Sequence, residues 1–301
     1  MTRVLITGGS GLIGSRLTTL LVEKGIEVVH LERSPGNSPI KTYLWNVEEG
    51  TIDASALIGV NAIIHLAGAS IGDGRWTARR KAEIVDSRVK STRLLLQELG
   101  NNSHEATTFV CASAVGYYGG ECGDEIKGEG DGPGADFLAD VCRQWEAAAS
   151  EMGSLGIRVV RMRTGIVLSP SGGALAPMVT QAKMGFAAPL GSGNQYMSWV
   201  HLDDLCRAYI YALTNNLLHG PYNIVAPSPV TNREFTKVLA HVMAKPQFMP
   251  AIPSFVLKLV LGEMSALVLE GCNVSSDKLR ASGFSFRFED VDTALRNVLS
   301  K

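Results

Sequence analysis

The stretch from residue 7 to residue 14, TGGSGLIG, constrains the fold of this chain more than any other. It follows an apolar run over 4–6 and opens an apolar-periodic segment over 12–22, a pattern that predicts a strand, a tight turn and a helix. Two of its glycines would let the backbone turn and approach a pyrophosphate, a third would let the helix pack on the strand, and free N–H groups would face the anion. The run therefore predicts a dinucleotide-binding site. The three glycines, in that order, are Gly8, Gly11 and Gly14.

Strand and helix patterns alternate through the first two thirds of the chain. Such alternation requires a parallel sheet with helices on both faces. We therefore predict an α/β fold, a Rossmann-like doubly wound parallel sheet with a smaller C-terminal substrate lobe. Further strands are expected at 27–31, 42–45, 62–66, 107–112 and 157–162, and helices at 76–99, 136–152 and 202–213.

The pattern changes near residue 169 to loops rich in glycine and proline. We expect residues 1–169 to form the dinucleotide-binding domain, with returns around 196–225. Residues 170–195 and 226–301 would form a substrate lobe, or cap, over the carboxyl ends of the strands, where such folds bind ligands. The apolar stretch 255–269 is interrupted by charges and a glycine, which predicts a buried helix pair and not a membrane span.

Composition limits the classes of partner. With 46% hydrophobic and 19% charged residues, the 301-residue chain can bury a large core. A net charge of −1 without a basic run argues against nucleic acid and membrane surfaces as partners, so we expect a small-molecule substrate and, as an assembly, a homodimer. No metal-ligand spacing is present, and the start of the chain lacks a signal-peptide pattern. Five dispersed cysteines without a redox-pair spacing fit a reducing cytosol and a cytoplasmic location. They are Cys111, Cys122, Cys142, Cys206 and Cys272.

The end of the second predicted strand carries the choice of cofactor. An acidic residue there would hydrogen-bond the ribose of NAD, whereas an arginine would accept the 2′-phosphate of NADP. The chain offers Glu32 followed by Arg33, with Ser34 beside them as a further donor. A guanidinium is the natural partner of a phosphate, so this pattern favours NADP(H). Two solvated charges at a strand end are the structural alternative.

The segment after the fourth predicted strand is a second candidate for cofactor contact. Small residues at 66–69 would let the strand end approach an adenosine, although they also suit a plain tight turn. Glu83, Ser87 and Arg88 follow on one side of the next predicted helix. That side would either line the cofactor groove or face solvent.

Several motifs resemble those of the extended short-chain dehydrogenase/reductase superfamily, the nucleotide-sugar epimerase-like group. These motifs lie at 7–14, 65–68, 113–119, 163–168 and 199–205. The likeness is closer to an atypical subfamily, the "epimerase family proteins", and covers nearly the whole chain. The motifs that mark this subfamily lie at 75–77, 86–88, 136–139, 145–149, 189–193, 197–199 and 261–264.

The resemblance implies NADP(H) binding on a Rossmann-like sheet with a C-terminal cap, and it favours the groove for the helix that carries Glu83 and Arg88. It places the cofactor between the glycine-rich run, the second strand, the loop after the fourth strand and the long helix. The residues implied are Gly8, Gly11, Leu12 and Ile13 at the pyrophosphate, Arg33 beside Glu32 at the 2′-phosphate, Leu66, Ala67 and Gly68 at the adenosine side, Glu83 and Arg88 from the helix, and Val167 near the nicotinamide.

The expected catalytic set is incomplete. Active members of the superfamily use a serine or threonine at the end of the fifth strand, and a tyrosine and a lysine four residues apart on the next helix. Ser113 matches the serine, but alignment on Trp145 and Glu146 puts Leu138 and Cys142 at the tyrosine and lysine positions. A shift of one residue gives Phe137 and Val141, which cannot transfer a proton either.

These residues are compatible with three functions. Tyr117 or Tyr118 replaces the missing acid, although a phenol with a pKa near 10 needs a neighbour to lower it. Alternatively, the cofactor transfers hydride and water or substrate supplies the proton. In the third reading the protein is a non-catalytic NADP(H)-sensing regulator. His201, before two aspartates, is expected at the start of a helix and not at a ligand.

Overall fold

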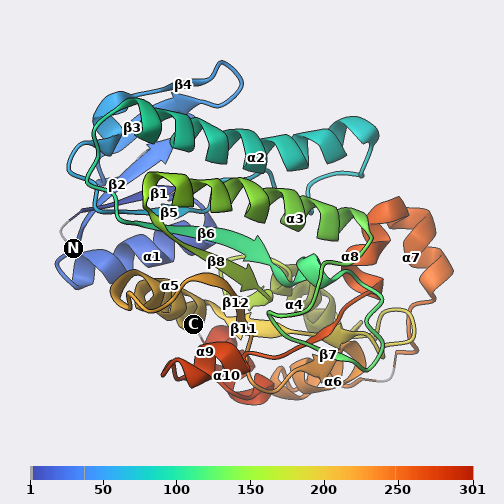
Figure 1. The fold of residues 1–301 in the computed structure, drawn as a ribbon. Helices are drawn as coiled ribbons and strands as arrows, with labels where there is room; N and C mark the ends of the chain where they lie inside the picture. The colour runs from blue at the N-terminus through green and yellow to red at the C-terminus, as the bar shows by residue number, and fades with distance from the viewer. Residues whose placement is uncertain (1–2, 37, 248, 301) are drawn as a thin grey trace.

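The structure, a computed structural model, describes residues 3–36, 38–247 and 249–300. Its centre is an eight-stranded sheet in the order β12-β8-β6-β5-β1-β2-β3-β4, in which every pair is parallel except β3 with β4 (Figure 1). The predicted α/β class and doubly wound parallel sheet are confirmed. The strands are β1 (Arg3–Thr7), β2 (Glu27–Glu32), β3 (Thr42–Asn46), β4 (Thr51–Ile52), β5 (Ala62–His65), β6 (Thr108–Ala114), β8 (Arg158–Thr164) and β12 (Gly220–Ile224).

Helices cover both faces of this sheet. Alternate residues of a strand point to opposite faces, so in β1 Val4 and Ile6 enter one buried apolar cluster and Leu5 the other. Helices α1 (Leu12–Glu23) and α5 (Leu202–Thr214) pack on the first face, and α2 (Ala78–Asn101) and α3 (Phe137–Ser150) on the second (Figure 1). The expected positions of the strands and of these four helices agree with the structure to within about two residues at nearly every end.

A smaller unit packs at one end of the sheet around Trp199, Phe235 and Leu295. Its core joins α4, α6 and α10 to two short strand pairs, β9 with β11 and β10 with β13, and a third pair joins β7 to β14. Their bounds are β7 (Ile126–Lys127), β9 (Ile166–Leu168), β10 (Tyr196–Met197), β11 (Trp199–His201), β13 (Val230–Thr231), β14 (Asn273–Val274), α4 (Leu175–Lys183), α6 (Asn232–Val242), α9 (Asp277–Ala281) and α10 (Val291–Leu299).

The apolar stretch 255–269 differs from its prediction. It forms α7 (Ser254–Leu261), the short helix η4 (Gly262–Ser265) and α8 (Ala266–Leu269), so a helix pair is present, but none of the residues of α7 is buried. Phe255 is 72% exposed and Leu259 is 78% exposed. The apolar composition predicted burial, but among the described residues no helix or strand covers the side of α7 that carries Phe255 and Leu259. Among the residues described here, no helix is long and apolar enough to span a membrane.

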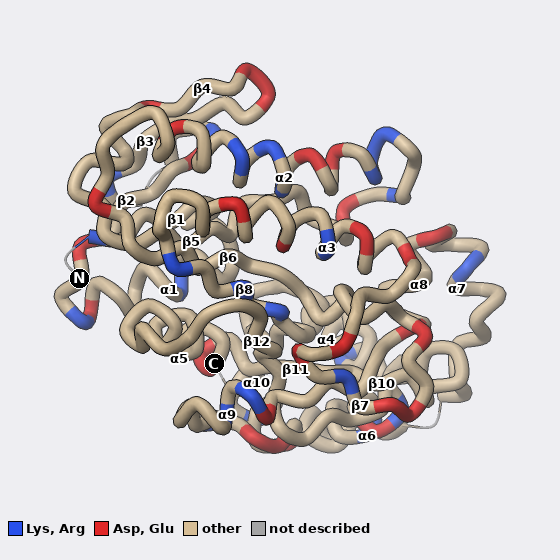
Figure 2. Tube along the Cα trace, viewed as in Figure 1, with Lys and Arg blue, Asp and Glu red and all other residues tan. Residues whose placement is uncertain are grey.

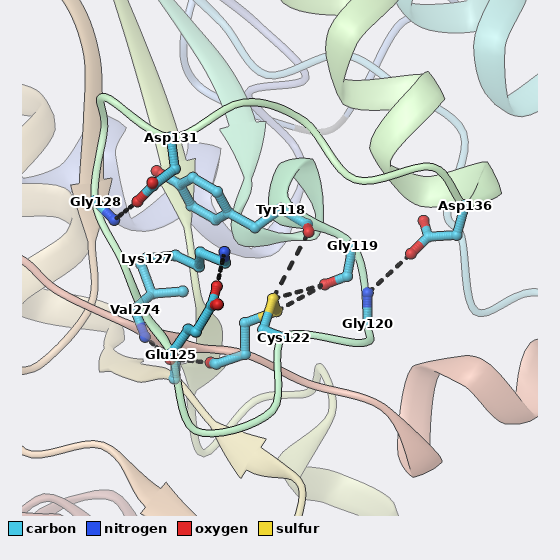
Figure 3. Close-up of a disulfide and its surroundings, with 12 residues drawn as sticks. Tyr118, Gly119, Gly120, Cys122, Glu125, Lys127, Gly128, Asp131, Asp136 and Val274 are labelled. Atoms are coloured by element: carbon cyan, nitrogen blue, oxygen red, sulfur yellow. Dashed lines mark hydrogen bonds and ion pairs between the residues drawn. A yellow bond between two sulfur atoms is a disulfide. The ribbon is translucent and has the colours of Figure 1, made fainter.

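The cysteines also differ from their prediction. Their spacing in the sequence gave no sign of a pair, yet Cys122 and Cys272 form a disulfide across 150 residues of chain (Figure 3). The three free cysteines, Cys111, Cys142 and Cys206, are buried. Pairing over such a separation depends on tertiary structure, which spacing does not report.

Candidate functional site

The order of the strands reverses between β1 and β5, and we refer to the region at the carboxyl ends of these two strands as the crevice. From β1 the chain continues to β2 and β3 on one side, then returns to β5, β6, β8 and β12 on the other. Ligands of open α/β sheets bind at such a switch point, outside the carboxyl ends of the strands. The loops after β1 and β5 meet here, because a Cβ on Gly8 would lie 3.2 Å from the backbone of Leu66 and Ala67.

The glycine-rich loop is packed so tightly that side chains would not fit. A Cβ on Gly14 would lie 2.3 Å from the carbonyl oxygen of Gly8, and one on Gly9 would lie 2.5 Å from the ring of His30. Gly8 itself has φ of +71°, which favours glycine. Helix α1 then begins at Leu12 without a side-chain cap, so the N–H groups of its first turn, Ile13 among them, face the crevice without an acidic partner. This geometry suits a bound anion.

Thr7 fixes the loop after β5. Its Oγ1 accepts hydrogen bonds from the N–H groups of Leu66 and Ala67, at 3.2 and 3.1 Å, so its own proton goes to Nδ1 of His65 at 2.8 Å. His65 Nε2 then donates to Ser91 Oγ, 3.2 Å away, on α2. Burial lowers the pKa of His65 to about 3, and the charge of Arg88 acts in the same direction. The neutral imidazole is therefore a structural link between β1, β5 and α2.

Glu32 and Arg33 have different environments at the end of β2. Glu32 accepts a hydrogen bond from the N–H of Ser10 at 2.9 Å, and this contact holds the glycine-rich loop. Arg33 is exposed, and within the described residues it makes no hydrogen bond or ion pair. One of the two candidates is thus already engaged with the protein, and the other is free to bind a ligand.

Helix α2 reaches the loop after β5 through two of the three predicted residues. Ser87 Oγ accepts from the N–H of Ala69 at 2.9 Å, and Arg88 Nη1 donates to the Ala69 carbonyl oxygen at 3.0 Å. The Arg88 guanidinium lies beside Gly68, and its Nε is buried without a hydrogen-bond partner in the part of the chain described. Glu83 is exposed and pairs with Arg80 at 2.8 Å. Charged residues of both signs lie along this helix (Figure 2).

Val167 approaches the glycine-rich loop from β9. A Cβ on Gly173 would lie 3.5 Å from Leu12 and 3.7 Å from the carbonyl oxygen of Val167, so this segment lies beside the start of α1. The candidate residues of the cofactor site therefore come from loops and helices around a single edge of the sheet.

Ser113, at the end of β6, belongs to a buried ionic network. Its hydroxyl donates to Glu146 Oε1 at 2.7 Å, and Arg163 donates to both oxygens of the same carboxylate at 2.7 and 2.9 Å. Glu146 and Arg163 are only 3% and 2% exposed. The sequence did not predict this pair. A detectable signal was a glutamate on the otherwise apolar face of the predicted helix 136–152, because buried carboxylates require partners.

The two tyrosines after Ser113 are not equivalent. Arg163 Nη1 donates to Tyr118 Oη at 2.9 Å, and Tyr118 donates to Asn223 Oδ1 at 2.7 Å. Burial raises the pKa of Tyr118 to about 12 despite the charge of Arg163. Tyr117 is half-buried, and its ring centre lies 3.4 Å from the guanidinium carbon of Arg163. Its hydroxyl makes no hydrogen bond within the described residues.

Leu138 and Cys142 lie on α3 near the segment that follows β6. A Cβ on Gly116 would lie 3.4 Å from that of Leu138. Burial raises the pKa of Cys142 to about 12. Leu138 packs in an apolar cluster with Trp76 and Met264, which joins the starts of α2 and α3 to η4 and α8. Neither residue offers a proton near neutral pH.

His201 is a helix cap, as its position in the sequence indicates. It precedes α5, its Nδ1 accepts from the N–H of Asp203 at 3.0 Å, and its ring stacks on Phe288 with centres 3.9 Å apart. Asp203 pairs with Arg16 at 2.7 Å, which ties α5 to α1. These contacts give His201 and Asp203 structural roles at the start of α5.

Comparison with known proteins agrees with this geometry. Residues 4–225 match the NAD dependent epimerase/dehydratase family, and residues 252–298 match a domain of unknown function, DUF1731. An epimerase family protein of Mycobacterium bovis is 38% identical over 97% of this chain and 96% of its own. A crystal structure of human epimerase family protein SDR39U1 with NADPH is 32% identical, has a TM-score of 0.89 and covers both chains fully. UDP-glucose 4-epimerase of Thermotoga maritima, at 18% identity and a TM-score of 0.81, shares the fold.

Proposed function

The chain belongs to the NAD dependent epimerase/dehydratase family, and from this we propose that it binds NADP(H) and acts as an oxidoreductase or epimerase-like enzyme without the usual tyrosine and lysine. The human relative that was crystallised with NADPH supports this choice of cofactor. The proposal concerns the crevice at the switch point between β1 and β5.

The observation that carries the proposal is the contrast between Glu32 and Arg33. Glu32 is held by the N–H of Ser10, whereas Arg33 is exposed and unpaired within the described residues. A free guanidinium at this strand end is suited to the 2′-phosphate that distinguishes NADP from NAD. Ser34, also exposed, is placed to donate a further hydrogen bond.

The remaining residues of the crevice fit a dinucleotide. The uncapped first turn of α1, with Leu12 and Ile13, would hold the pyrophosphate. The loop over 66–68 would flank the adenosine side, with Glu83 nearby, and Arg88 has a buried Nε still to be satisfied. Val167 would lie toward the nicotinamide. When bound, the cofactor supplies or accepts hydride, and the protein supplies orientation.

Tyr117 is the side chain we propose as the proton donor, beside Ser113. Tyr118 cannot serve, because its hydroxyl is engaged by Arg163 and Asn223. Tyr117 keeps its hydroxyl available, and the guanidinium of Arg163 lies against its ring with the guanidinium carbon 3.4 Å from the ring centre. Ser113 remains hydrogen-bonded to Glu146 and would position a substrate oxygen next to that network.

A second candidate function is a non-catalytic NADP(H) sensor. It is favoured by Leu138 and Cys142, which are packed side chains at the two positions where proton chemistry is expected. In this case cofactor binding would change the position of the C-terminal cap, because Leu138 belongs to the same apolar cluster as Met264 of the cap.

The test is a calorimetric titration of the purified protein with NADPH and with NADH. It is followed by absorbance at the nicotinamide band as a panel of carbonyl compounds and nucleotide sugars is added. NADPH binding tighter than NADH binding, with oxidation by a panel member, supports the enzyme. NADPH binding without turnover across the panel favours the sensor. Absence of NADPH binding contradicts both.

A further inference from the structure

The disulfide Cys122–Cys272 joins the two parts of the chain that match different families. Cys122 lies in the part that matches the epimerase/dehydratase family, and Cys272 in the part that matches DUF1731. Their Cα atoms are 5.2 Å apart, within the range that a disulfide needs, and both side chains are buried (Figure 3). The bond therefore connects the sheet domain to its C-terminal cap.

A few hydrogen bonds and a short strand pair also join the loop around Cys122 to the segment around Cys272. The N–H of Gly271 donates to the carbonyl oxygen of Gly120 at 3.3 Å, and β14 pairs with β7 over only two residues. Ser198 accepts from the N–H of Val274 at 3.1 Å and donates to the carbonyl oxygen of Cys272 at 2.8 Å. The strand pair is short, so the covalent link is a main contact of this loop with this segment, whereas helices α9 and α10 pack on the rest of the protein separately.

The loop that carries Cys122 also bears directly on the candidate site. It leaves β6 through Tyr117 and ends at Asp136, which caps α3. Within it, the N–H of Gly120 donates to Asp136 Oδ2 at 2.8 Å (Figure 3), and the N–H of Gly134 donates to the carbonyl oxygen of Tyr117 at 2.9 Å. A restraint at Cys122 is thus transmitted to Tyr117 and to the start of α3.

The residues on both sides of Cys122 lie at the surface of the protein. Glu121 and Gly123 are exposed, and a Cβ on Gly123 would point into open space apart from its own chain neighbours. The three free thiols lie within the central sheet and the helices that cover it. Cys142 and Cys206 lie within packed helices, and burial raises the pKa of Cys142 to about 12, which suppresses its thiolate.

We propose that Cys122 and Cys272 form a reversible redox site that fastens the C-terminal cap to the loop bordering the candidate active site. In the oxidising direction, two thiols and one molecule of hydrogen peroxide give the disulfide and two molecules of water. In the reducing direction, a dithiol attacks the bond by exchange, releases both thiols and becomes a disulfide itself. Reduction loosens the contact of the cap with the loop.

The first experiment counts thiols in the full-length protein. Samples treated with peroxide or with dithiothreitol are freed of reagent, unfolded, alkylated with iodoacetamide and weighed by mass spectrometry. We expect three alkylated cysteines after peroxide and five after dithiothreitol, with the blocked pair mapped to peptides that contain Cys122 and Cys272. Five alkylated cysteines after peroxide, or a different blocked pair, would overturn the proposal.

The second experiment measures the consequence of the bond. Reduction is expected to lower the Tm by about 5 °C in the wild type, since the bond closes a long loop of the unfolded chain. Cys122→Ser and Cys272→Ser are expected to remove this response, whereas Cys206→Ser, a buried cysteine outside the pair, keeps it. A response that persists without Cys122 contradicts the proposal, and the thiol count decides the question even if a variant fails to fold.

The effect on the site rests on the proposed function and is measured separately. We expect reduced wild type to bind NADPH several-fold more weakly than oxidised wild type, and Cys272→Ser to bind equally under both conditions. If neither form binds NADPH, the proposed cofactor fails while the thiol count still tests the redox site. If both forms bind equally, the bond does not act on the site.

Discussion

Ser113 donates its hydroxyl hydrogen bond to Glu146, whose carboxylate oxygen lies 2.7 Å away in the interior. The same carboxylate accepts two bonds from Arg163, so the serine is one member of an ionic network and not an isolated hydroxyl. This relationship connects β6, α3 and β8 just behind the candidate active site. It also makes the network a determinant of stability.

Replacing Glu146 by glutamine is expected to destabilise the protein by about 3–5 kcal/mol, because the buried guanidinium of Arg163 loses its counter-charge. Chemical denaturation measures the change. The control is Glu151→Gln, which breaks an exposed pair with Arg93 at 3.3 Å and is expected to cost less than about 1 kcal/mol. If the two variants lose similar amounts of stability, burial does not determine how much the pair of Glu146 and Arg163 contributes.

Replacing Arg33 by alanine is expected to weaken NADPH binding by about 1.5–3 kcal/mol, the value of a charge-assisted hydrogen-bonded pair, and to leave NADH binding nearly unchanged. Calorimetric titration of the variant with each cofactor measures both effects. Arg93→Ala, at an exposed position on α2, is the matched control and should bind both cofactors as the wild type does. An equal loss for NADPH and NADH would exclude Arg33 as the phosphate ligand.

Gly14→Ala is expected to lower NADPH affinity at least about tenfold and to cost about 1–3 kcal/mol of stability. The added methyl group would meet the Gly8 carbonyl oxygen at 2.3 Å, so the glycine-rich loop and α1 must separate. Gly100→Ala, in α2, is the control, since its methyl group would meet only Leu155 at 3.8 Å and alanine favours the helix. A variant at Gly14 that binds and unfolds like the wild type would contradict the proposed cradle.

Tyr117→Phe is expected to lower kcat about 10²–10⁴-fold with any carbonyl substrate that the panel identifies, and to leave the NADPH affinity and the Tm nearly unchanged. The matched change Tyr118→Phe is expected to lower the Tm, because Arg163 and Asn223 each lose a buried hydrogen bond. If the variant without the Tyr117 hydroxyl turns over at the wild-type rate, Tyr117 is not the proton donor, and water or the substrate supplies the proton.

Local patterns predicted the sheet and its helices well, because each rests on short-range periodicity. Two strands of the sheet, β4 and β12, were not predicted. Strand β12 begins with Gly220 and Pro221, residues that are poor strand formers, and it is positioned by its pairing with β8. The glycine-rich loop was predictable since its function requires a fixed local sequence. Its closeness to the loop after β5 was implied only by the resemblance to a known family, because the two segments are about 55 residues apart in the sequence.

Long-range pairs account for most of what the sequence did not reveal. Glu146 and Arg163 meet only after α3 packs on β8, and the cysteines of the disulfide are 150 residues apart. Helix α7 is exposed although burial was predicted for it, because apolar composition alone does not determine which surface a helix packs against.

The buried imidazole of His65 predicts a specific dependence of stability on pH. Burial lowers its pKa to about 3, below the value of 6.5 expected in the unfolded chain, so on acidification the unfolded state binds the proton first. Its contribution is complete above about pH 6.5 and is lost as the pH falls toward 3. Between pH 7 and pH 4.5 the loss amounts to about 3 kcal/mol.

Denaturant titrations of wild type and His65→Gln across this range measure that dependence as the difference in slope, since the carboxylates titrate in both proteins. We expect the variant to be less stable at pH 7, where Thr7 and Ser91 lose their ring partner, and to lose less stability on acidification. His219→Gln, at an exposed histidine, should keep the wild-type slope. Parallel curves for wild type and His65→Gln would mean that the imidazole is protonated in the folded protein, and its hydrogen bonds with Thr7 and Ser91 would then need to be reassigned.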